Sequence, residues 1–228
     1  MSLGGLPPGI ALRDPRPIAA EAPYTFFMPH PQELEALRPG DGIKAIFTQT
    51  EGETKYDAER MWVLIERIED GVVYGTLDND PSDMSLIEAG NPVAIPLTHV
   101  ISTAFHKDNP RPETPERREY WERCLVDACI VEGRSHVDYL YRETPDMTRE
   151  GDEYEDSGWR LRGSEAEVEA DQANDSAPRY IALGAVLNRD DRWIHLLDEE
   201  PGVAFQWDGD AQDYIRFNRP DLAEADDQ

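Results

Sequence analysis

The sequence predicts an α+β protein dominated by β-strands, with two small domains of which the first is a barrel-like β-domain. The clearest observation is a β-hairpin. Two apolar, β-branched runs within residues 60–77 flank Glu69-Asp70-Gly71, and Asp-Gly tolerates the positive φ angles of a tight turn. The length of 228 residues allows one large domain or two ordinary ones. The proline-rich stretch 107–115 is typical of a domain boundary.

Residues 1–35 are predicted to form a proline-rich extended arm, because seven prolines within residues 1–31 oppose helix formation. Up to about Ala22 we expect this arm to be mobile. A group of large apolar residues follows: Tyr24, Phe26, Phe27 and Met28. We expect this group to dock on a domain, because its exposure to water would be costly, and a partner-binding strip is the alternative. Residues 31–37 are expected to form a short helix that ends at Pro39-Gly40.

The predicted first domain covers residues 36–105. Its expected strands are residues 43–47, the two arms of the hairpin, and residues 92–97, where two prolines indicate an edge strand. Residues 84–89 are predicted to make one helical turn. Alternation along the first hairpin arm places Trp62 and Leu64 on one face and Met61, Val63 and Ile65 on the other.

A linker at residues 106–115, a second domain at 116–217 and an acidic tail at 218–228 complete the predicted organisation. Thr114 is expected to cap a helix that runs to about Arg123. A strand at residues 125–131 should pair with residues 137–141 as a second hairpin. Further strands are predicted at residues 159–162, 193–197 and 203–207, and a buried element at 180–187. Residues 163–178 are predicted to be a loop with a helical turn at 165–170.

The charge is strongly acidic, with 22 Lys and Arg against 48 Asp and Glu, a net charge of −26. Because phosphate binding needs clustered basic residues, nucleic acid and anionic membranes are poor partners. Solubility alone explains such a charge, and attraction of a basic protein partner is the alternative. We find no stretch of about 18 apolar residues and no signal peptide, so we expect a cytoplasmic protein.

No motif in the chain carries recognisable chemistry. Walker, GxSxG, GxGxxG, HExxH and paired CxxC patterns are missing, and no histidine lies three or four residues from another. Cys124 and Cys129 are expected to be independent buried residues, and His195 a hydrogen-bonded structural histidine. We therefore expect no cofactor, no metal site and no catalytic residue.

Two arginines and two aromatic residues stand among many acids in the second half: Tyr141, Arg142, Trp159 and Arg160. One interpretation is structural, with Trp159 in a core and the arginines paired to carboxylates. The other is a recognition patch, since Trp, Tyr and Arg dominate interface hot spots. If Trp159 is structural, recognition is expected on the acidic loop, through Glu165, Glu167 and Glu169.

Residues 140–208 resemble a bacterial family grouped with immunity proteins of polymorphic toxin systems. The resemblance rests on Tyr141, Arg142, Asp156, Ser157, Gly158, Trp159, Asn188, Pro201, Gly202, Ala204 and Phe205. We identify this family as domain of unknown function 2185, which is immunity-protein-33-like. Residues 37–102, including LRPGDGIKAIF and ERMWVLIERIEDGVVYGTLDNDP, resemble domain of unknown function 2314.

The resemblance implies a non-enzymatic protein-binding module that neutralises a bacterial toxin by occlusion. An acidic surface suits a basic toxin, such as a nuclease. The alternatives are an enzyme or small-ligand-binding protein with its pocket between the two domains, and a housekeeping scaffold. The sequence does not define an oligomeric state.

Overall fold

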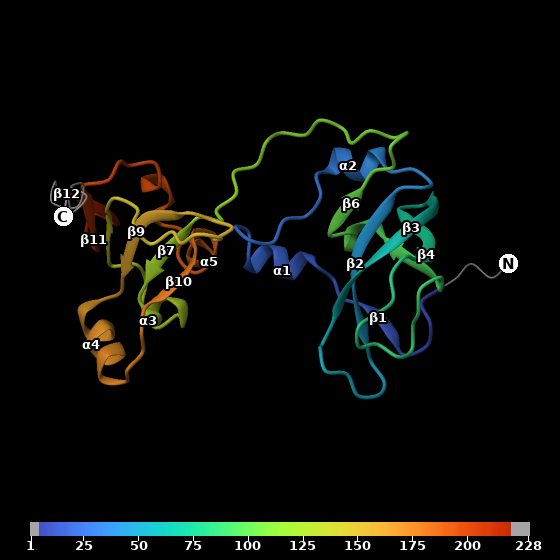
Figure 1. Cartoon of the computed structure of the whole chain (residues 1–228), viewed down its shortest axis with the longest axis horizontal. Helices are drawn as coiled ribbons and strands as arrows, with labels where there is room; N and C mark the ends of the chain where they lie inside the picture. The colour runs from blue at the N-terminus through green and yellow to red at the C-terminus, as the bar shows by residue number, and fades with distance from the viewer. Residues whose placement is uncertain (1–4, 220–228) are drawn as a thin grey trace. The chain divides into compact units, whose positions relative to one another are not determined.

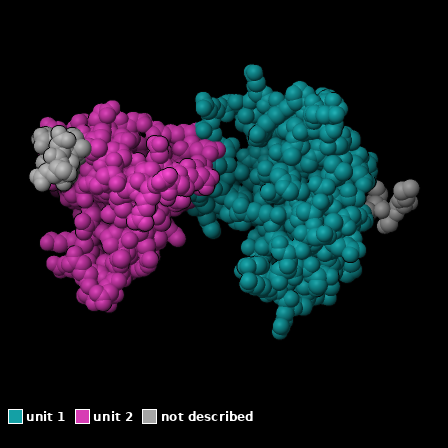
Figure 2. Space-filling view, in the orientation of Figure 1, with its two compact units in different colours: residues 1–117 teal, residues 118–228 magenta. Residues whose placement is uncertain are grey.

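The computed structural model describes residues 5–219, and the chain divides into two compact units, residues 1–117 and 118–228 (Figure 2). Each unit is built on its own six-stranded sheet (Figure 1). The predicted fold class, β-dominated with two small units and a barrel-like first unit, is confirmed. The predicted linker, residues 106–115, lies inside the first unit, and the other predicted domain boundaries stay predictions.

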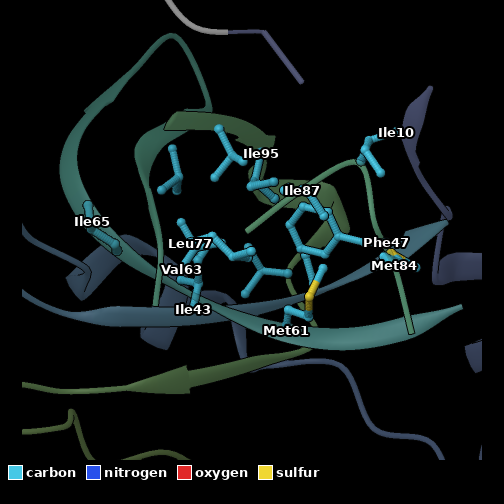
Figure 3. Packing of buried hydrophobic residues seen from close by; sticks show 14 of the residues in the cluster. Ile10, Ile43, Phe47, Met61, Val63, Ile65, Leu77, Met84, Ile87 and Ile95 are labelled. Carbon is cyan, nitrogen blue, oxygen red and sulfur yellow. The ribbon is translucent and has the colours of Figure 1, made fainter. Parts of the chain in front are cut away.

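The first unit wraps an antiparallel sheet into a nearly closed barrel. Its strands are β1 (Ile10–Leu12), β2 (Gly42–Gln49), β3 (Glu59–Glu69), β4 (Val72–Leu77), β5 (Pro92–Pro96) and β6 (Ser102–Ala104). The strands follow the order β1-β2-β3-β4-β5, and β6 also pairs with β2. Apolar side chains from all around the sheet meet inside it, among them Ile43, Phe47, Met61, Val63 and Ile95 (Figure 3).

The central hairpin forms as predicted. Asp70 and Gly71 take positive φ angles of 50° and 75° at the turn between β3 and β4. Met61, Val63 and Ile65 point into the core, which confirms the predicted facing of β3. Trp62 lies half-buried on the outer face, where the Lys44 ammonium group sits 4.3 Å from its ring centre.

The amino-terminal segment contains more regular structure than the predicted extended arm. Residues 10–12 form β1 against the end of β2, and a short helix, α1 (Arg16–Glu21), follows. The prediction that prolines exclude a helix here is wrong for α1, because they stand at its start, where the missing N–H is not needed. The predicted helix at residues 31–37 is confirmed as α2 (Pro31–Ala36), and His30 and Glu33 form its capping box.

Residues 84–89 do not form the predicted helical turn. Side chains bind their backbone N–H groups instead: Glu59 accepts hydrogen bonds from Asp83 and Met84, and Gln49 accepts from Ser85 and Leu86. These carboxylate and amide oxygens replace the carbonyl groups that would accept within a helix. A short 3₁₀ turn, η1 (Leu97–His99), follows β5, whose edge position is confirmed.

The second unit holds a mixed sheet with the order β10-β7-β9-β8-β11-β12. Its strands are β7 (Arg123–Val126), β8 (Tyr139–Arg142), β9 (Asp156–Arg162), β10 (Arg179–Ala182), β11 (Val203–Asp208) and β12 (Asp213–Asn218). The β7–β9 pair is parallel and the others are antiparallel. Its helical segments are α3 (Ala128–Val131), α4 (Glu165–Ala173), α5 (Leu183–Leu187) and the 3₁₀ turn η2 (Ile194–Leu196).

Several predictions for this unit are wrong. The helix expected from Thr114 to Arg123 does not form, because the carbonyls of Tyr120 and Glu122 accept hydrogen bonds from Gly184 and Leu183 in an extended segment. The strand at residues 125–131 ends at Val126 and turns into α3, and β7 pairs with β9 and β10 rather than with β8.

Residues 193–197 contain η2 instead of a strand. Residues 165–170 begin a nine-residue helix, α4, in place of a single turn. The strands at residues 159–162 and 203–207 are confirmed as β9 and β11, whereas β12 was not predicted. Most of the predicted acidic tail, from residue 220 onward, lies outside the described residues.

Candidate partner-binding face

One face of the second sheet belongs to the core of its unit, and Trp159 lies at the centre of this face. Its side chain is fully buried, with its ring centroid 6.0 Å from that of Trp193 and 6.5 Å from that of Phe205. Its indole N–H donates a hydrogen bond to the Leu197 carbonyl at 3.3 Å. The structural interpretation of Trp159 therefore holds, because a side chain in this position does not reach a partner.

Arg142 is also part of this core face. Its guanidinium group donates hydrogen bonds to the carbonyls of Ser157 at 3.0 Å and Glu199 at 2.6 Å, and it lies 5.7 Å from the Trp159 ring. These contacts tie β8 to β9 and to the segment before β11. Arg142 thus holds backbone in place and is half-buried.

Arg160 is buried beneath carboxylates. Asp156 accepts two hydrogen bonds from it at 2.9 and 2.8 Å, and Glu143 and Asp146 accept one each. Burial alone raises the pKa of Asp156, but Arg160 and the backbone N–H groups of Gly158 and Met147 more than offset this, and its pKa is lowered. Asp156 is thus an ion-paired carboxylate, the opposite of the raised carboxylate that a general acid requires.

Gly158 allows the backbone near Arg160 to approach the backbone next to Arg142 closely. Its φ angle is +76°, and an added Cβ atom would lie 2.1 Å from the Glu143 carbonyl oxygen. The Glu143 backbone N–H donates to the Gly158 carbonyl at 3.0 Å. Only glycine allows this approach of the two strands, and the approach brings Glu143 over Arg160.

The other face of the sheet is partly exposed, chiefly along β12. Residues that stand directly opposite one another in paired strands share a face, so the register places Tyr139, Gln206 and Ile215 in one row and Tyr141, Ala204 and Phe217 in the next. Ile215 and Phe217 are 47% and 48% exposed, and the two tyrosine rings lie 5.8 Å apart. We call Tyr139, Tyr141, Gln206, Ile215 and Phe217 the open face.

Acidic side chains border the open face. A hollow beside it is lined by Tyr139 and Gln206 from the sheet and by Glu165, Val168 and Glu169 from α4. Glu167 points elsewhere and pairs with Arg134, which also binds Asp171. Of the three glutamates expected on an acidic loop, two therefore border the open face and one does not, because the segment is a helix.

Sequence reasoning missed most of the open face. It named Tyr141 but not Tyr139, although the alternation in residues 137–141 already places both on one face of a strand. Ile215 and Phe217 were missed because β12 was not predicted. The sequence contains a strand pattern here too, because the apolar residues Ile215 and Phe217 alternate with Arg216.

The two cysteines and His195 are the other residues considered for reactivity from the sequence. Cys124 and Cys129 are free and buried, as predicted, and burial raises the pKa of Cys129 to about 12, so this thiol stays protonated. His195 is exposed on η2, with Nε2 3.4 Å from an Asp213 carboxylate oxygen. Among residues 5–219, no three His, Cys, Asp or Glu side chains are placed to hold a metal ion. No helix in that range is long and apolar enough for a membrane span.

The fold and the site define a two-domain β-rich protein with one open, acid-bordered sheet face. Residues 124–217, nearly the whole second sheet, match the family model described as the immunity protein Imm33 domain. Residues 32–109 match the model described as an uncharacterized protein conserved in bacteria, DUF2314. Neither the curated proteins nor the solved structures contain a match.

The two matched segments follow one another in the order that the resemblances imply, DUF2314 first and Imm33 second. The identification as immunity-protein-33-like is confirmed. The number 2185 is wrong, because the matched model is the Imm33 domain. The Imm33 match suggests an immunity-type protein.

Proposed function

We propose that this protein is a non-enzymatic immunity-type protein that binds a basic bacterial toxin and occludes it through the open face of the second sheet. The observation that carries the proposal is the Imm33 match, which covers the strands that build this face. Family membership supplies the class of function, and the open face supplies a surface suited to it.

The chemistry of the open face supports protein recognition. Tyrosine rings offer large apolar contact area with few rotatable bonds, which lowers the entropic cost of binding. Burial raises the pKa of Tyr141, and nearby Glu143 adds to the rise, so its hydroxyl stays a neutral hydrogen-bond donor. Exposed Ile215 and Phe217 extend the apolar surface beyond the two tyrosines.

The acids support a basic partner. Glu165 and Glu169 border the open face on α4, and the chain has a net charge of −26. Complementary charge speeds encounter and orients the partner before apolar groups make contact. A toxin that acts on nucleic acid presents such a basic surface, because phosphate binding requires it.

The test is protection of growth by co-expression with the product of the gene immediately upstream of this protein's gene, taken as the candidate toxin domain. The wild-type chain should protect, and a Tyr139→Ala/Tyr141→Ala double variant should protect much less. Tyr56→Ala is the matched control, because Tyr56 is 53% exposed in the first unit. Thermal melts of all three proteins establish that they are folded. Failure of the wild-type chain to bind or protect would overturn the function, and full protection by the double variant would exclude the open face.

A further inference from the structure

The strand β12 is an unprotected edge. It pairs with β11 over six consecutive residue pairs without a bulge and has no neighbour on its other side within residues 5–219. Natural sheets protect such edges with proline, charged side chains (lysine above all), bulges or very short strands, because unpaired backbone groups attract other strands. The charged residues of β12 are Asp213, at its first position, and Arg216, whose guanidinium group pairs with Glu199. β12 contains neither proline nor lysine, and five of its six residues are exposed.

The other sheet edges in the described part of the chain do carry protection. β5 has a proline at each end, Pro92 and Pro96. β1 and β6 are three residues long, and β10 is four residues long and runs directly into α5. The contrast makes the bare edge of β12 a distinctive feature of the second unit.

The register identifies the backbone groups that this edge offers. Arg219 N–H donates to the Gly202 carbonyl at 2.8 Å, and bonded pairs alternate along an antiparallel ladder. Phe217 and Ile215 therefore bond to β11, whereas Tyr214, Arg216 and Asn218 direct their N–H and C=O groups away from it. The Tyr214 N–H is already bound by the Asp213 carboxylate at 2.8 Å. Arg216 and Asn218 remain as two complete pairing positions.

We infer that β12 receives an extended segment of the basic partner, which adds a seventh strand to the second sheet. The inference rests on the proposed function and specifies how the partner is held. Main-chain hydrogen bonds supply affinity in such strand addition, and alternate side chains supply specificity. Because Ile215 and Phe217 lie at this edge of the open face, the added strand carries apolar residues at alternate positions beside them.

Charge favours a basic segment over a second copy of this chain. Asp208, Asp210 and Asp213 flank one end of β12, and the sequence that follows Arg219 contains four more acids. Arg216 does not counter them, since its guanidinium group pairs with Glu199 at 2.8 Å. A second copy would bring the same acids to the edge, whereas Lys or Arg residues at the ends of the added strand would pair with them.

Amide hydrogen exchange tests the inference on the full-length chain, with the product of the gene immediately upstream as the probe, provided that it passes the protection test above. Exchange at Arg216 and Asn218 should slow at least about tenfold in the complex, because each amide gains a hydrogen bond. Ile215 and Phe217 are the internal reference, because β11 protects their amides with or without the partner. Unchanged exchange at Arg216 and Asn218 in a complex that forms would overturn strand addition while the proposed function stands.

A pair of variants isolates the backbone group. Arg216→Pro removes both the arginine side chain and the outward backbone N–H. Arg216→Ala removes the side chain but keeps this N–H. We expect Arg216→Pro to bind at least about tenfold more weakly than Arg216→Ala, a factor that corresponds to about 1.4 kcal/mol. Asn218→Pro against Asn218→Ala repeats the comparison near the strand end if Arg216→Pro fails to fold.

The remaining outcomes also decide between hypotheses. Equal affinity of the folded proline and alanine variants would overturn strand addition. In the free protein, protection of the Arg216 and Asn218 amides that increases with protein concentration would identify a second copy of this chain as the occupant. That result would overturn the inference. A toxin domain that does not bind the wild-type chain would overturn the proposed function, and the inference with it.

Discussion

The two units place buried acids in different surroundings. In the first unit, the side chains inside the sheet are apolar, and the buried acids Glu33 and Asp41 lie outside it. Glu33 binds Arg111 and the His30 N–H, and Asp41 binds the N–H groups of Arg38 and His106. These two acids fasten α2 and the segment after β6 to the barrel without entering its core.

In the second unit, four buried aspartates each bind an arginine: Asp127 with Arg162, Asp156 with Arg160, Asp171 with Arg134 and Asp190 with Arg192. Each aspartate also accepts a backbone hydrogen bond, from Gly163, Gly158, Cys129 and Val137 respectively. Through these backbone hydrogen bonds Asp127, Asp171 and Asp190 each connect their own segment to one that is distant in the sequence. The second unit therefore adds four buried Asp–Arg ion pairs to an apolar core that includes Trp159, Trp193 and Leu161, whereas the side chains inside the first sheet are apolar.

The largest expected effect comes from Arg160→Met, which leaves the buried Asp156 carboxylate without its counter-charge. Breaking one side of such a pair costs about 3–5 kcal/mol. Hydrogen exchange resolved by segment should show this loss in the second unit and no change in the first. Arg149→Met, at an exposed arginine in the loop before β9, is the control. Equal losses in both units would contradict the comparison.

Met61→Ala is the corresponding change in the first unit. Met61 is fully buried in the barrel, so the cavity should cost about 2–5 kcal/mol, measured by denaturant-dependent exchange of β2 and β3. Trp62→Ala should cost only about 1 kcal/mol, since its ring is half-buried beside Lys44. A Trp62 loss as large as the Met61 loss would show that the outer face contributes as much as the core.

The next largest effect is expected on acidification, which should unfold the two units at different pH values. Burial raises the pKa values of Asp156, Asp171 and Asp190, but their arginine and backbone partners outweigh it, and all three are lowered. A lowered folded-state pKa gives stability that is complete above the unfolded value of about 4 and is lost as pH falls through the folded value. The second unit should therefore unfold first below about pH 4, because it holds three buried acids with a lowered pKa, whereas Glu33 is the buried acid of the first unit that contributes in this way. Segment-resolved exchange against pH measures this, and earlier loss of the first unit would contradict it.

The smallest expected effect concerns partner binding. Glu165→Gln/Glu169→Gln should slow association with the toxin domain about twofold at low salt, and the difference should shrink as the Debye length falls to about 8 Å at physiological salt. Dissociation should stay the same. Glu167→Gln is a matched control on the same helix, since this residue faces Arg134. If Glu167→Gln slowed association equally, the association rate would depend on the net charge of the chain and not on the position of Glu165 and Glu169 beside the open face.

The sequence predicted best what local patterns determine. The hairpin around Gly71 and the facing of Met61 and Trp62 follow from turn chemistry and alternation alone. The pairing of β7 with β9 does not, because a parallel pair joins segments about thirty residues apart and leaves no local signal. The helix expected after Thr114 failed for a related reason, since Tyr120 and Glu122 bond to the distant residues Gly184 and Leu183.

For the candidate site, the sequence identified unusual residues but not the side of the sheet on which they lie. Trp159, Arg160 and Tyr141 are similar as interface residues, yet the pairing of β8 with β9 places Trp159 on the core face and Arg160 beside Tyr141 on the other face. Arg160 is nevertheless buried, because the carboxylates of Glu143, Asp146 and Asp156 cover it. Facing depends on register, and register here depends on non-local pairing. The family resemblance succeeded where periodicity could not, because it compares whole segments.

The position of β12 at the end of the described chain has a consequence for the timing of synthesis. Every strand pair of the first sheet lies within residues 10–104, whereas the second sheet is complete only at Asn218. At about 5–20 residues per second, the residues in between emerge over roughly ten seconds. The barrel can close during this interval, while β7 still lacks β9 and β10. Because β12 follows the other strands of the second sheet in the chain, the edge that we infer to bind the partner forms only after Asn218 has emerged.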